Sequence, residues 1–183
     1  EKPEAAWENP VLVIVRGIKY NESYKMLTGG ICMGSYLNPG NEAFAVALNS
    51  EIYVDKTGLL TYTNKVMNTL QGYICNSRPR RFGKSITANM LTAYYSKGCD
   101  SRELFSPYKI SESDSFETHL NKYNVIHINM VEYLTEAKSI ENLIKYIEDD
   151  IIGDITDSMP ELVMPRRISL TKVLASAFNQ FKI

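Results

Sequence analysis

The residues Gly83, Lys84 and Ser85 stand between a short apolar segment, residues 73–75, and a segment with helical spacing of apolar residues. At the start of a helix the first backbone N–H groups lack partners within the helix, and the helix dipole places partial positive charge there. A polyphosphate would be both hydrogen-bonded and attracted at such a place. The spacing therefore predicts a phosphate-binding loop, in which Gly83 allows close approach, Lys84 reaches the β- and γ-phosphates and Ser85 ligates Mg²⁺.

This loop departs from the strict pattern G-x-x-x-x-G-K-[ST] at its first position, where the chain has Arg78. The context supports the prediction, because Ile86, Met90 and Tyr94 recur at steps of four and Gly98 is suited to end the helix. A strand, basic loop and helix that bind no phosphate remain the alternative.

The elements that must position the loop follow from spacing and turn residues. The pattern predicts strands at residues 52–54, 73–75 and 125–130, and helices beginning near residues 41, 55, 85, 114, 139 and 169. Strands that alternate with helices indicate an α/β domain with a parallel sheet, in which ligands bind at the carboxyl ends of the strands. The loop would lie at such an end. We therefore expect a P-loop NTPase-type parallel sheet with flanking helices.

Composition narrows the class of protein. The chain has 183 residues, of which 44% are hydrophobic, enough for one domain with a core. The net charge of −1 gives no global attraction to nucleic acid or an anionic membrane. Three cysteines without a Cys-x-x-Cys pair indicate reduced thiols in a cytoplasmic protein, rather than a disulfide scaffold or a zinc site. The longest apolar run, residues 11–15, is too short to span a membrane.

His119 and His127 are too far apart to form a local ligand pair, and we assign them structural roles.

Five segments recur in order and at matching spacing in one family. They are residues 52–57, the loop at residues 77–85, and residues 93–98, 101–105 and 120–127. Together they resemble the predicted AAA-ATPase-like family of bacterial P-loop proteins, over about residues 33–183. The loop of that family is itself Arg-Pro-Arg-Arg-Phe-Gly-Lys-Ser, so Arg78 in place of glycine agrees with the resemblance.

The motif and the resemblance define one candidate site for ATP and Mg²⁺. The candidate nucleotide-binding residues are Arg78, Pro79, Arg80, Arg81, Phe82, Gly83, Lys84, Ser85, Ile86 and Thr87. Lys84 and Arg81 are the catalytic candidates, and Ser85 is the candidate Mg²⁺ ligand. The three arginines have two interpretations, neutralisation of phosphate charge or binding of an acidic surface or nucleic acid. The segment Asp55-Lys56-Thr57 is a family motif that we interpret as a cap between a strand and a helix.

Hydrolysis by a P-loop protein needs a carboxylate at the end of another strand, which holds Mg²⁺ and orients water. No apolar strand of this chain ends in Asp-Glu, and Asn129, the polar residue ending the 125–130 strand, cannot act as a base. In the family, the acidic strand follows a helix resembling residues 170–179. We therefore expect a fragment cut before its acidic (Walker B) strand, inactive alone and active in ATP hydrolysis at full length. The family usually continues into a PD-(D/E)xK nuclease-like domain, a possible partner.

The expected domain organisation has two parts. Residues 33–183 would be the N-terminal part of the AAA-ATPase-like domain. Residues 1–32 would be either an N-terminal extension with a strand at residues 11–15, or a non-native read-through of a ribosome-binding site. Three functional classes stay open: an ATPase coupled to a partner domain, a regulatory module that binds nucleotide without turnover, and a nucleic-acid-binding module that uses Arg78 to Arg81.

Overall fold

A computed structural model describes residues 11–16, 34–77, 79 and 81–181. The elements in order are β1 (Val11–Arg16), α1 (Glu42–Leu48), α2 (Gly58–Val66), α3 (Lys84–Tyr95), α4 (Arg102–Phe105), the 3-10 helix η1 (Lys109–Glu112), α5 (Phe116–His119), β2 (Asn124–Asn129), α6 (Met130–Glu136), α7 (Ile140–Ser158) and α8 (Leu170–Phe181). The mixture of helices and strands confirms the α/β prediction at this coarse level. In the described part of the chain, no helix is both long and apolar enough to cross a membrane.

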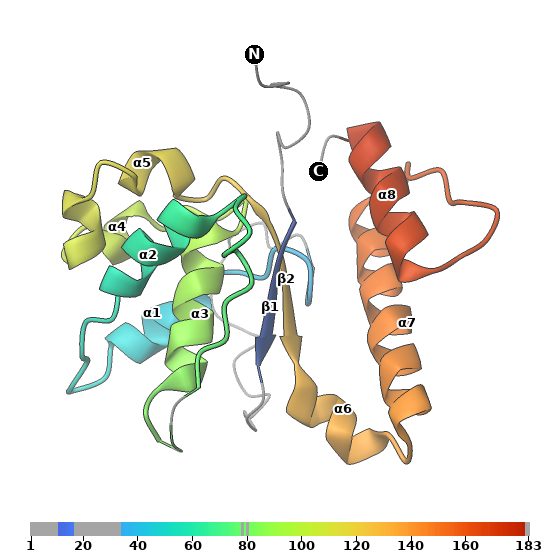
Figure 1. The fold of residues 1–183 in the computed structure, drawn as a ribbon, viewed down its shortest axis with the longest axis horizontal. Coiled ribbons are helices and arrows are strands. Elements are labelled where there is room, and N and C mark those ends of the chain that lie inside the picture. The colour runs from blue at the N-terminus through green and yellow to red at the C-terminus, as the bar shows by residue number, and fades with distance from the viewer. Residues whose placement is uncertain (1–10, 17–33, 78, 80, 182–183) are drawn as a thin grey trace.

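A two-stranded parallel sheet lies between two groups of helices (Figure 1). β1 pairs with β2 over six residues, from Val11 opposite Asn124 to Arg16 opposite Asn129. The helices α1 to α5 lie on one side, and α7 and α8 lie on the other. β2 is buried towards both groups, because successive side chains of a strand point to opposite faces. Val125 belongs to the core on the α1–α5 side, whereas Ile126 and Ile128 belong to the core on the α7–α8 side.

Two of the predicted strands are wrong. Residues 52–54 and 73–75 are irregular, and the Tyr73 side chain is 97% exposed. A strand needs a neighbour that satisfies its backbone hydrogen bonds, and β2 already has a neighbour at each edge. β1 pairs along one edge, and Leu37 forms an antiparallel bridge to Ile126 at the other. The strand at residues 11–15, expected if residues 1–32 are an N-terminal extension, forms as β1 and occupies one edge of β2.

The predicted helix starts agree with the structure within three residues. The Ser139 hydroxyl accepts a hydrogen bond from the Asn142 N–H at 3.2 Å and caps α7 as a serine at this position is expected to do. Asn41 precedes α1 but does not cap it, because its side chain instead donates to the Asp100 carbonyl and the Ser101 hydroxyl.

Candidate functional site

The start of α3 has an unusual backbone. Gly83 precedes the helix with φ +72° and ψ 29°, in the left-handed region that glycine adopts without steric cost. Arg81 has φ +68°, a conformation that costs a non-glycine residue about 1–2 kcal/mol. Lys84 and Ser85 are the first two residues of the helix, so their N–H groups are among those without an intrahelical partner. No side chain caps this end, and its first turn has no acidic residue.

Two lysine side chains donate to carbonyl groups of the loop. Lys84 Nζ lies 3.0 Å from the Pro79 carbonyl oxygen, within its own loop. Lys56 Nζ lies 2.8 Å from the Phe82 carbonyl oxygen, although it comes from a segment 26 residues away. A Cβ atom added to Gly83 would overlap the Lys56 ammonium group. The positive end of α3 thus has two ammonium groups beside it.

The segment Asp55-Lys56-Thr57 is fixed in place by its outer residues. Asp55 accepts hydrogen bonds from the Thr57 N–H at 2.8 Å and the Lys109 N–H at 3.2 Å. The Thr57 hydroxyl accepts one from the Ile110 N–H at 3.2 Å, and Thr57 is fully buried. Burial disfavours ionisation of Asp55, but the hydrogen bonds to its carboxylate outweigh burial and lower its pKa. No side chain caps α2, so the interpretation of this segment as a helix cap is wrong. Its outer side chains instead bond to the turn before α2 and to η1.

The predicted site residues are distributed between an exposed loop and the helix. Arg78 and Arg80 lie outside the described residues. Pro79, Arg81 and Phe82 are exposed, whereas Gly83, Lys84, Ser85 and Ile86 are half-buried and Thr87 is buried. Ile86 packs against the core on the α1–α5 side. The Thr87 hydroxyl donates to the Gly83 carbonyl at 3.0 Å, so this side chain bonds to the helix start.

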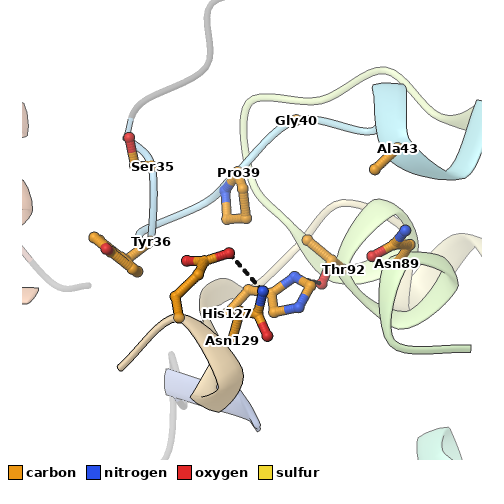
Figure 2. Close-up of a pocket in the computed structure, with 10 residues that line it drawn as sticks. Ser35, Tyr36, Pro39, Gly40, Ala43, Asn89, Thr92, His127 and Asn129 are labelled. Atoms are coloured by element: carbon orange, nitrogen blue, oxygen red, sulfur yellow. Dashed lines mark hydrogen bonds between the residues drawn. The ribbon is translucent and has the colours of Figure 1, made fainter. Parts of the chain in front are cut away.

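A cavity of about 210 Å³ lies farther along α3 (Figure 2). It is lined by Ser35, Tyr36, Pro39, Gly40, Ala43, Asn89, Thr92, His127, Asn129 and Glu132. Two pairs of these residues are already bonded to one another, Thr92 with His127 at 3.0 Å and Asn129 with Glu132. The structural role predicted for His127 agrees with its bond to Thr92. None of the described loop residues lines this cavity, so the loop and the cavity are separate features that both adjoin α3.

The fold and the loop define a mixed α/β protein with a basic segment at the start of a buried helix. The model of the family described as predicted AAA-ATPase matches residues 42–180. The chain belongs to this AAA-ATPase-like family, which confirms the resemblance and indicates nucleotide binding or ATPase activity as the class of function. No curated protein and no solved structure matches the chain.

Proposed function

We propose that this protein binds ATP with Mg²⁺ at the loop of residues 78–85, and that the full-length protein hydrolyses ATP. The observation that carries the proposal is the left-handed Gly83 directly before Lys84 and Ser85 at an uncapped helix start. Membership of the AAA-ATPase-like family supports nucleotide as the ligand. A helix start without acidic residues also suits a polyphosphate, because its N–H groups and dipole both favour negative charge.

The residues at the start of α3 offer donors for phosphate oxygens and one hydroxyl group for Mg²⁺. Lys84 would exchange its bond to the Pro79 carbonyl for a phosphate oxygen, which is the stronger acceptor because it is charged. The Ser85 hydroxyl, at the second position of α3, would ligate Mg²⁺. When bound, Mg²⁺ supplies charge neutralisation at the β- and γ-phosphates.

Arg81 is the proposed catalytic partner of Lys84. Its side chain is exposed beside the helix start, and its backbone is held in the left-handed region. A guanidinium group in this place would stabilise the charge that spreads over the phosphate oxygens during transfer. Arg81 would act during phosphoryl transfer, whereas Lys84 and Ser85 would also contribute to the binding of ATP and Mg²⁺.

The test compares ATP affinities of the protein and its Lys84→Ala variant by calorimetry with Mg²⁺. A hydrogen bond to a charged group is worth about 1.5–3 kcal/mol, so the variant should bind ATP about tenfold to a hundredfold more weakly. Lys65→Ala is the matched control, because Lys65 is an exposed lysine in the last turn of α2. Equal affinities for Lys84→Ala and the parent would contradict the proposed site.

A further inference from the structure

We infer that Lys56 is a second phosphate-binding lysine of the nucleotide site, which exchanges the Phe82 carbonyl for a phosphate oxygen of the bound nucleotide. The inference rests on the proposed function, because it assigns a role in the same site. The motif analysis interpreted this segment only as a cap before a helix. In the structure, its outer residues bond to the turn before α2 and to η1, whereas the ammonium group of its central residue, Lys56, reaches the phosphate loop.

The backbone around Lys56 is held on both sides, which fixes the direction of its side chain. Asp55 and Thr57 accept hydrogen bonds from the successive N–H groups of Lys109 and Ile110. Lys56 lies between these anchors and extends its side chain to the Phe82 carbonyl at 2.8 Å. A site whose supporting residues are fixed loses less entropy when it binds a ligand.

The Lys56 ammonium group occupies the space beside Gly83, at the N-terminal end of α3, where the helix dipole is positive. The first turn of α3 offers no carboxylate to offset it. The Phe82 carbonyl is a neutral acceptor, and an ionised phosphate oxygen in the same region would form a stronger, charge-assisted hydrogen bond. Positive charge beside a positive helix end therefore favours a polyanion as the ligand.

A rival role for Lys56 is purely structural, namely to hold the Phe82 carbonyl and thereby shape the loop. The two roles differ in what they require of residue 56. Holding a carbonyl needs an N–H donor of suitable reach, whether neutral or charged. Binding a phosphate draws on the positive charge as well, because charge-assisted hydrogen bonds are roughly twice as strong as neutral ones.

The experiment uses this difference and measures affinity for ATP with Mg²⁺ by calorimetry. Lys56→Gln keeps an N–H donor without the charge, and Lys56→Arg keeps the charge. We expect Lys56→Gln to bind ATP about tenfold more weakly, and Lys56→Arg to stay within about threefold of the parent protein. Lys65→Gln, at an exposed lysine of α2, controls for loss of one surface charge. Thermal unfolding of every variant checks the fold, and affinity below about a third of the parent's in Lys56→Arg would count against the inference even if Lys56→Gln does not fold.

The outcomes separate this inference from the proposed function. Parent-like affinity in Lys56→Gln, together with weaker binding in Lys84→Ala, would overturn the role of Lys56 and leave the nucleotide site standing. Equal losses in Lys56→Gln and Lys56→Arg would assign Lys56 to loop shape and also overturn it. A parent protein that binds no ATP would overturn both.

Discussion

The two ends of α3 are held in different ways. At the C-terminal end, Ala93, Tyr94 and Tyr95 are fully buried, and the amide group of Asn121 donates to the carbonyls of Ala93 at 3.0 Å and Ser96 at 2.9 Å. At the N-terminal end, no side chain caps the helix and the loop before it is exposed. A side chain thus caps the C-terminal end of α3, whereas no side chain caps its N-terminal end.

The buried end is also tied to α2 by a polar network. The Tyr95 hydroxyl donates to Asn64 at 2.7 Å and shares a hydrogen bond with Thr63. The Asn64 amide donates to the Tyr94 hydroxyl at 3.1 Å, which in turn donates to the Phe116 carbonyl at 3.1 Å. These bonds anchor α3 rigidly where no ligand is expected. Substitutions near residue 94 should therefore affect stability, whereas substitutions near residue 84 should affect binding.

The largest effect is expected from Tyr94→Ala. The ring of Tyr94 lies 5.3 Å from that of Phe105, and its hydroxyl takes part in the network. Removing a buried aromatic ring of this size should lower the free energy of unfolding by about 3–5 kcal/mol. Urea unfolding measures the loss. Tyr62→Ala, at an exposed tyrosine of α2, is the control and should change stability by less than about 0.5 kcal/mol. Similar losses of unfolding free energy in both variants would contradict the conclusion that the C-terminal end of α3 is held by its buried side chains.

An intermediate effect is expected at Asn121, which has φ +54° as well as its capping bonds. Asn121→Ala should lose about 2 kcal/mol of stability, because it removes the cap and places alanine in the left-handed region. Asn121→Gly should lose less, since glycine adopts this φ freely while still lacking the cap. The difference between the urea midpoints of the two variants gives the cost of the left-handed backbone, and the loss in Asn121→Gly gives the cost of the missing cap. A loss in Asn121→Gly as large as that in Asn121→Ala would assign the whole effect to the cap.

The smallest effect on stability is expected from Gly83→Ala. Alanine at φ +72° costs about 1 kcal/mol, and the added Cβ must displace the Lys56 ammonium group. Gly83 itself contributes no side chain to the core, so the main consequence should be weaker ATP binding. Gly58→Ala, where an added Cβ would meet no atom within 4 Å, is the control for both measurements. Unchanged ATP affinity in Gly83→Ala, seen in calorimetry, would remove Gly83 from the site.

Local patterns predicted α1, α2, α3, α5, α7 and α8, because each apolar stripe is specified by residues close in sequence, and they missed the short elements α4, η1 and α6. The Ser139 cap of α7 is an example. The same reasoning assigned a strand to residues 73–75, and it failed because pairing is decided by competition for the edges of β2, where residues 11–16 pair instead. The apolar content of a short segment does not reveal which segment obtains the partner.

The candidate loop could be predicted from Gly83, Lys84 and Ser85, because these three consecutive residues form the end of the phosphate-loop motif. The contribution of Lys56 was not, because its bond to the Phe82 carbonyl joins segments 26 residues apart. The signal that pointed to this residue was the motif Asp55-Lys56-Thr57. Its outer side chains bond to the turn before α2 and to η1, whereas its central lysine bonds to the Phe82 carbonyl. The Asn121 cap of α3 was missed for the same reason, since its partners Ala93 and Ser96 precede it by 25 residues or more.

Hydrogen–deuterium exchange with and without saturating ATP and Mg²⁺ tests the difference between the two ends of α3 most directly. Exchange reports local opening, and ligand contacts slow it where they form. The account predicts slower exchange on nucleotide addition at residues 81–87, and no change at residues 90–95, which the fold already protects. No slowing at residues 81–87, or equal slowing along the whole helix, would contradict it.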